Sequence, residues 1–139
     1  MPAPFPIASL NGQLLRLDEV RISWNDRGFL YGDGLFETIR VHSGRPFLWE
    51  WHVTRFMDSA ATLRIPLRQT PDSLPGIAHE LIKRNNGPKS ILRITLTRGV
   101  GERGYAISSA EEPTLLIPQH PLPSAPTKPL SLVTTAARI

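Results

Sequence analysis

Three short stretches of this chain hold side chains that could bind a small anionic ligand. The first, residues 26–40, contains three glycines, Tyr31 and two arginines before it runs into an alternating, strand-like sequence. Glycines at this density allow tight turns and let side chains and amides approach a ligand closely. The segment predicts a ligand-facing turn, which Asp33 and Glu37 are expected to hold through backbone hydrogen bonds.

The second stretch, residues 50–56, reads Glu-Trp-His-Val-Thr-Arg-Phe. His52 and Arg55 are three residues apart, so they would share one face of a helix. An arginine near a helix start could bind a phosphate, because the helix dipole favours an anion there. A solvated arginine beside a surface histidine is the ordinary alternative. The four histidines of the chain show no metal-ligand spacing.

The third stretch, residues 98–105, reads Arg-Gly-Val-Gly-Glu-Arg-Gly-Tyr and follows the clearest strand pattern in the chain. A glycine-rich loop with two arginines at a strand end suits a carboxylate. It lacks the Gly-Lys-Ser or Gly-Lys-Thr of a phosphate-binding loop and the helix that a dinucleotide fingerprint requires. An ordinary hairpin loop is the alternative, and no nucleophile elbow is present in the chain.

Periodicity predicts the elements that must position these stretches. Val53, Phe56 and Ala60 follow helical spacing, whereas residues 90–97 alternate as in a strand. The expected elements are a hairpin over 6–17 around Asn11-Gly12, a strand over 36–42, a turn over 43–46 with a return strand over 47–49, helices over 50–63 and 73–85, and strands over 90–97 and 114–117. This layout is α+β, with a mixed or antiparallel sheet covered by two helices.

A change in composition predicts the domain organisation. Prolines at 118, 121, 123, 126 and 129 are too dense for a helix or a central strand. We therefore expect a small domain over residues 1–118, a proline-rich linker over 119–129, and the start of a truncated second domain over 130–139.

The bulk composition limits the kinds of partner. The chain has 139 residues, no cysteine and a net charge of +4, and arginine supplies 13 of its 16 basic residues. Cysteine chemistry is excluded, and no apolar run or leader pattern suggests a membrane or an export signal, so we expect a cytoplasmic protein. The arginines are scattered without a basic cluster or a base-stacking stripe, which favours bidentate binding of a small anion over nucleic acid.

Together and in this order, the motifs resemble those of the class IV (fold-type IV) pyridoxal-phosphate enzymes. That family includes branched-chain and D-amino-acid aminotransferases and aminodeoxychorismate lyase. The motifs are Asp26-Arg27-Gly28, the Tyr-Gly-Asp-Gly-Leu-Phe-Glu of residues 31–37, the Glu-x-His-x-x-Arg of residues 50–55, and the loop over 98–105. The resemblance extends over nearly the whole chain, from residue 10 onwards.

The resemblance implies a role for each motif and pyridoxal 5'-phosphate as the cofactor. Arg55 would bind the cofactor phosphate, with His52 supporting it. The loop that holds Arg103 and Tyr105 would bind the substrate carboxylate, often across a dimer interface. The full set of expected substrate-binding residues is Tyr31, Phe36, Arg40, Arg98, Arg103 and Tyr105. We expect a homodimer that binds a small amino substrate, with no nucleic-acid or membrane partner.

Within the family, two features are most like aminodeoxychorismate lyase, which releases pyruvate and forms 4-aminobenzoate for folate. They are Phe36-Glu37-Thr38 and the Arg-Gly-x-Gly-x-Arg-Gly-Tyr loop. Branched-chain enzymes usually have glycine after Phe-Glu, and D-amino-acid enzymes usually have tyrosine in place of Phe36 and a histidine near Tyr105. Branched-chain or D-amino-acid transamination is the alternative activity, and an isolated binding domain is the non-enzymatic one.

The chain departs from the family pattern in its lysines. Members need a lysine that forms the cofactor Schiff base, and only Lys83, Lys89 and Lys128 are present. None has the apolar surroundings that lower an amine pKa. By alignment, the Schiff-base lysine is expected beyond Ile139, so no catalytic residue is expected in this chain and the chain alone is expected to be inactive.

Overall fold

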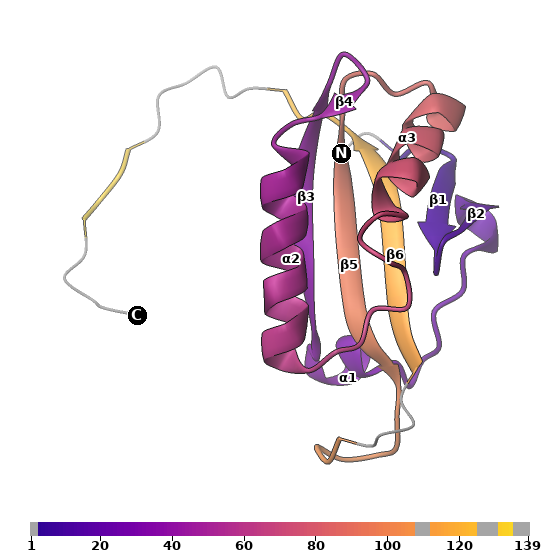
Figure 1. Ribbon diagram of the computed structural model, residues 1–139, viewed down its shortest axis with the longest axis vertical. Coiled ribbons are helices and arrows are strands. Elements are labelled where there is room, and N and C mark those ends of the chain that lie inside the picture. Colours follow the sequence, from indigo (N-terminus) through magenta and orange to yellow (C-terminus); the bar gives the residue numbers. More distant parts are fainter. Residues whose placement is uncertain (1–2, 108–111, 125–130, 135–139) are drawn as a thin grey trace.

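The computed structural model describes residues 3–107, 112–124 and 131–134, and it contains one six-stranded sheet with two long helices on one face (Figure 1). The strand order is β2-β1-β6-β5-β3-β4, and every pairing is antiparallel. The elements are β1 (Ile7–Leu10), β2 (Gln13–Arg16), the 3-10 helix η1 (Leu17–Glu19), α1 (Arg27–Tyr31), β3 (Gly34–His42), β4 (Arg45–Pro46), α2 (Trp49–Leu63), α3 (Leu74–Asn85), β5 (Ser90–Val100) and β6 (Glu112–Pro121). The predicted α+β class is confirmed, with the sheet antiparallel rather than mixed.

The hydrophobic core lies between the sheet and these two helices. α2 lies along β3, and α3 lies against β1 and β6 (Figure 1). The helical periodicity is confirmed, since Val53, Phe56 and Ala60 of α2 are buried. On β3, Ile39 and Val41 are buried while Phe36 and Arg40 are exposed, so alternate residues point to opposite faces. The sheet therefore has a packed face and a more open face.

Two tight turns fix the pairing of the short strands. Asn11 and Gly12 both have positive φ, as a two-residue hairpin turn requires, and the predicted first hairpin is confirmed. Ser43 and Gly44 form a second turn of this kind. Because that turn uses only two residues, pairing resumes at once in β4, and the return strand predicted over 47–49 is wrong.

β6 continues further than the sequence indicated, through Pro121 rather than Ile117. Gln119 is fully buried there, with its Nε2 donating to the Gly87 carbonyl at 2.9 Å and its Oε1 accepting from Asn85 at 2.9 Å. These contacts hold β6 against the end of α3, so residues 119–121, predicted as linker, belong to the sheet.

The remainder of the predicted linker and second domain stays a prediction. Residues 122–124 and 131–134 have no regular secondary structure. The rest of the predicted linker and of the strand-like run, 125–130 and 135–139, lies outside the described residues.

Candidate functional site

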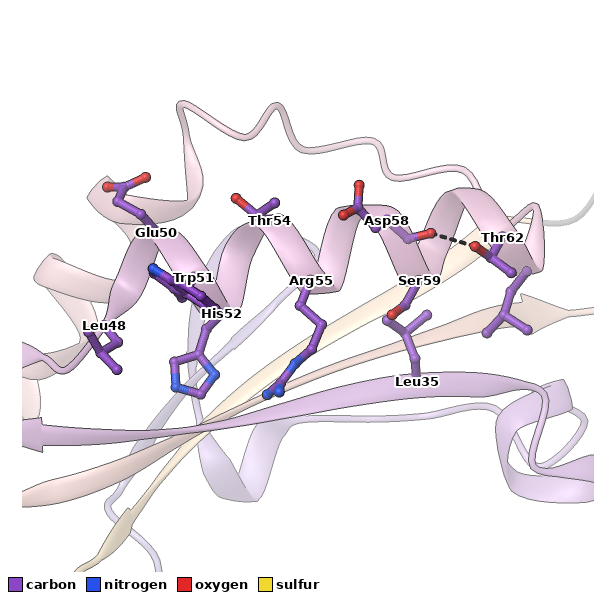
Figure 2. A pocket seen from close by; sticks show the side chains of 11 residues that line it. Leu35, Leu48, Glu50, Trp51, His52, Thr54, Arg55, Asp58, Ser59 and Thr62 are labelled. Carbon is purple, nitrogen blue, oxygen red and sulfur yellow. Dashed lines mark hydrogen bonds between the residues drawn. The ribbon is translucent and has the colours of Figure 1, made fainter. Parts of the chain in front are cut away.

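A groove of about 1050 Å³ runs along the solvent side of α2, beside β3 (Figure 2). Most of its lining comes from one helix face and the preceding turn. The lining residues are Leu35, Leu48, Glu50, Trp51, His52, Thr54, Arg55, Asp58, Ser59, Thr62 and Leu63. His52 and Arg55 point from α2 toward β3, whereas Glu50, Thr54 and Asp58 point away from it (Figure 2). His52 and Arg55 thus form the wall of the groove next to the strand.

Glu37 of β3 anchors that wall. Its Oε1 accepts from Arg55 Nε at 2.6 Å, and its Oε2 accepts from Arg55 Nη2 at 2.7 Å. The same Oε2 lies 2.7 Å from Nδ1 of His52. The expected shared face of His52 and Arg55 is confirmed, but the backbone role expected for Glu37 is wrong, because its carboxylate binds these two side chains.

Arg55 and His52 both stabilise the ionised form of the Glu37 carboxylate. Hydrogen bonds from Arg55 lower the pKa of Glu37 below its ordinary value; burial opposes the shift, and His52 adds to it. Glu37 therefore stays ionised at neutral pH and fixes the guanidinium in one orientation. Arg55 remains 68% exposed at its side chain, and its Nη1 has no hydrogen-bond partner among the described residues. That nitrogen is available to a ligand in the groove.

The position of Arg55 corrects the helix-start argument. Arg55 is the seventh residue of α2, which begins at Trp49. At 1.5 Å per residue it lies about 9 Å along the helix axis. The helix dipole acts mainly within the first turn, so anion binding here depends on the guanidinium alone.

A second cluster joins Arg27 and Asp33, which are six residues apart, to Arg98, which lies 65 residues beyond Asp33. Oδ2 of Asp33 accepts from Nε of Arg27 at 2.9 Å and from Nε of Arg98 at 2.9 Å. Burial would raise the pKa of Asp33, but hydrogen bonds from Arg98 and Arg27 outweigh it and the pKa lies below its ordinary value. The expected backbone role of Asp33 is therefore also wrong, because its side chain holds two arginines.

Arg98 occupies a structural position. Its side chain is only 4% exposed, and its two Nη atoms donate to the carbonyls of Leu63 at 2.8 Å and Arg64 at 2.9 Å. Those carbonyls terminate α2, where helix geometry leaves them without intrahelical partners. The structure therefore does not support the substrate-binding role predicted for Arg98.

The segment read as a glycine-rich turn contains the short helix α1. Asp26 caps it by accepting from the Gly28 amide at 2.8 Å, and Asp26 also accepts from Thr97 at 2.9 Å and Thr114 at 2.8 Å. A Cβ added to Gly28 would lie 2.2 Å from the Thr97 side chain, so only glycine fits there. Asp26 and Thr97 were missed as positioning residues, although an aspartate before a short segment is a known cap signal.

The remaining predicted substrate residues fall into two groups. Tyr31 of α1, just before β3, and Tyr105, in the same loop as Arg103 after β5, come together with ring centroids 5.3 Å apart. Phe36 and Arg40 are on the open face of β3, opposite Glu37 and Arg55. The guanidinium of Arg93 lies 3.6 Å from the centre of the Phe36 ring.

The outer edge of β3 is open along most of the strand. β4 pairs with β3 only at Val41 and His42, so no strand of the described residues covers the outer edge of β3 before them. A ligand that contacted both Arg55 and Phe36 would extend around this edge. Among the described residues there is no cluster of potential metal ligands, and no helix is long and apolar enough to cross a membrane.

The chain is similar to known proteins of one enzyme family. The family model for class IV amino-transferases matches residues 34–139. The D-alanine aminotransferase of Staphylococcus aureus strain MSSA476 is 34% identical over 108 residues, which cover 77% of this chain and 38% of that enzyme. A putative branched-chain-amino-acid aminotransferase of Methanocaldococcus jannaschii is 34% identical over 114 residues, covering 82% of this chain and 40% of that protein. The chain thus spans about two fifths of the length of these relatives.

Solved structures show the same fold. The 4-amino-4-deoxychorismate lyase of Pseudomonas aeruginosa aligns with a TM-score of 0.71 and 31% identity over 86% of this chain and 41% of that one. The branched-chain aminotransferase of Escherichia coli aligns with a TM-score of 0.79 over 85% of this chain and 41% of that one, at 23% identity, which shows the fold alone. On the match to the family model and these relatives, the chain belongs to the class IV aminotransferase family.

Proposed function

We propose that the protein containing this chain uses pyridoxal 5'-phosphate to act on a small amino substrate, and that this chain provides the phosphate contact and part of the substrate wall. The observation that carries the proposal is Arg55, an exposed guanidinium that Glu37 holds in place inside the groove. When bound, the cofactor supplies an electron sink for the chemistry at the amino carbon.

The groove fits a phosphate in its donor set. Arg55 presents Nη1 toward the groove while its other nitrogens are held, which reduces the rotamer freedom that binding would cost. Ser59 lines the groove on the same helix and adds a hydroxyl. Because Glu37 offsets the charge of Arg55, the phosphate would be held by directed hydrogen bonds rather than by a strong positive field.

The substrate would lie along the edge of β3. Phe36 offers an apolar surface on the open face, and Arg40 is exposed four residues further along the same strand. Arg103 and Tyr105 approach from the loop after β5, beside Tyr31. These five residues form our proposed substrate set, and Arg98 is left out because it caps α2.

Between the activities of the family, we favour release of pyruvate from aminodeoxychorismate to give 4-aminobenzoate. Two exposed arginines, Arg40 and Arg103, suit a substrate with two carboxylates. The 31% identity to the Pseudomonas lyase supports this choice. Transamination is the second candidate, and the 34% identity to a D-alanine aminotransferase and to a branched-chain enzyme favours it.

The reacting lysine is proposed to lie outside this chain. Lys83 and Lys89 are exposed to solvent, so neither lies in the kind of desolvated apolar pocket in which a reacting lysine is activated. Lys128 lies outside the described residues. Homodimer assembly and a cytoplasmic location stay predictions.

Substrate assays on the complete protein with added pyridoxal 5'-phosphate test the proposal. Aminodeoxychorismate should yield fluorescent 4-aminobenzoate, while D-alanine or branched-chain amino acids with 2-oxoglutarate should yield little oxo acid. The reverse pattern would replace the lyase with the transaminase. Absence of turnover on all of these substrates would contradict the proposed function.

A further inference from the structure

Arg27, on α1, is a buried cation that reaches a loop far away in the sequence. Its side chain is 3% exposed, and Nη1 donates to the carbonyls of Gly104 at 2.9 Å and Ala106 at 3.2 Å. Nη2 donates to the carbonyl of Tyr105 at 3.4 Å. One guanidinium thus binds three successive carbonyls, 77 to 79 residues further along the chain.

Tyr31 completes the attachment from the same helix, one turn after Arg27. Its hydroxyl accepts from the Gly104 amide at 3.0 Å, so α1 binds both backbone polar groups of Gly104. Gly104 has φ of +114°, a conformation that other residues rarely adopt. The Arg27 guanidinium carbon also lies 5.1 Å from the centre of the Tyr31 ring. Two side chains of α1, Arg27 and Tyr31, therefore bind the loop backbone at residues 104–106.

Asp33 fixes Arg27 in turn. Its Oδ2 accepts from Nε of Arg27 and of Arg98, and Arg98 binds the last carbonyls of α2. The same helix carries Arg55 in its second turn. Hydrogen bonds of Arg27, Asp33 and Arg98 therefore connect the loop to the end of α2, the helix that carries Arg55.

The side chains of the loop are left available. Tyr105 is 85% exposed although its carbonyl is held, and Arg103 is exposed with no hydrogen bond among the described residues. The backbone of this loop is thus held, while the side chains of Arg103 and Tyr105 remain accessible. This is the arrangement expected where side chains must meet a ligand from a fixed backbone.

We infer that Arg27 is a positioning residue, which holds residues 103–105 in the conformation that binds the substrate; the inference rests on the proposed function. The three carbonyls are bound by two nitrogens of one guanidinium while a third nitrogen binds Asp33, a fork of donors that only arginine carries. A lysine at this position keeps the charge near Asp33 but offers a single nitrogen. Arg27→Lys should therefore release the loop while α1 stays folded.

Limited trypsin digestion of the complete protein measures how firmly the loop is held. Trypsin cleaves the bond between Arg103 and Gly104, and Gly104 is the residue that α1 binds. Arg27→Lys should speed this cleavage about tenfold, and Tyr31→Phe, which removes one acceptor, about threefold. Cleavage after the exposed Arg21 should be unchanged in the same digests. Arg84→Lys, on the exposed face of α3, is the matched control and should alter neither rate.

Steady-state kinetics separate positioning from a purely structural effect. In Arg27→Lys, KM for the amino substrate should rise about tenfold with kcat within about twofold of wild type. Cleavage after Arg103 that is unchanged in both variants would overturn the inference, whether or not the protein is active. Faster cleavage with unchanged KM would also overturn it, since the loop would then not contact the substrate. A wild-type protein without turnover refutes the proposed function, and the digests do not depend on that result.

Discussion

Replacing Glu37 with glutamine tests the cluster that holds Arg55. The carboxylate accepts two hydrogen bonds from Arg55 and lies 2.7 Å from His52, and it is buried. Glutamine keeps the shape but has one acceptor oxygen and no charge. Glu37→Gln should therefore lose the charge-assisted contacts and place an amide N–H against Arg55 or His52.

The loss of stability expected for Glu37→Gln depends on which contacts of Glu37 are shielded from water. Arg55 is largely exposed, so we assign its pair with Glu37 no share of the stability. The contact with His52 is better protected, with a side-chain exposure of 20% for His52 and 7% for Glu37. Loss of one such hydrogen bond predicts a fall of about 1 kcal/mol in the free energy of unfolding.

The pH dependence gives this effect a second signature. The pKa of Glu37 is lowered in the folded state, so its contribution is present above the ordinary value of 4.5 and is lost as the pH falls through the folded pKa. The difference between wild type and Glu37→Gln should be constant from neutral pH to about pH 5.5 and then shrink in acid.

Urea unfolding of the complete protein, followed by tryptophan fluorescence at several pH values, measures both signatures. Glu80→Gln is the matched control, because Glu80 pairs with Arg84 on an exposed helix face. A Glu37→Gln variant no less stable than Glu80→Gln would show that the Glu37 carboxylate does not stabilise the fold. So would a stability difference that does not change in acid.

Three further changes have expected outcomes. Arg98→Met should lower the free energy of unfolding by about 3 kcal/mol, because it removes a buried ion pair and the cap of α2. In the fraction that folds, KM for the amino substrate should be nearly unchanged. A raised KM at wild-type stability would restore Arg98 to the substrate set. Gly99→Ala should destabilise by several kcal/mol in urea unfolding, since an added Cβ would lie 1.6 Å from the Glu112 carbonyl oxygen, whereas Gly44→Ala, with open space around it, should cost about 1 kcal/mol. Residues 1–139 expressed alone should give no turnover and no pyridoxyl group retained after borohydride reduction; either signal would place a reactive lysine within this chain.

The long elements could be predicted because their signals are local. The spacing of Val53, Phe56 and Ala60 identifies α2, and Asn11-Gly12 identifies the first hairpin. α1 was missed because Gly28 and Gly32 suggested a turn, and tertiary contacts with Thr97 stabilise those five residues as a helix. β6 was predicted too short because the partners of Gln119 lie about 30 residues away.

The site was harder to predict because the sequence alone does not distinguish a ligand-binding arginine from a structural one. Arg55 and Arg98 both belong to motifs that resemble those of the family. Arg55 is exposed in the groove, whereas Arg98 is buried against the last carbonyls of α2. What separates them is the position of their acidic partners, Glu37 and Asp33, which pair across 18 and 65 residues. A single sequence carries no direct record of such pairing, so the roles of these carboxylates emerged only from the structure.

The affinity of the complete apoprotein for pyridoxal 5'-phosphate measures whether Arg55 holds the cofactor phosphate. Arg55→Ala should raise Kd by at least about tenfold, and Arg55→Lys should fall between, since lysine keeps the charge without the fork. Arg45→Ala, on β4 and outside the groove, should leave Kd unchanged. If Arg55→Ala binds the cofactor as tightly as wild type, Arg55 does not hold the phosphate.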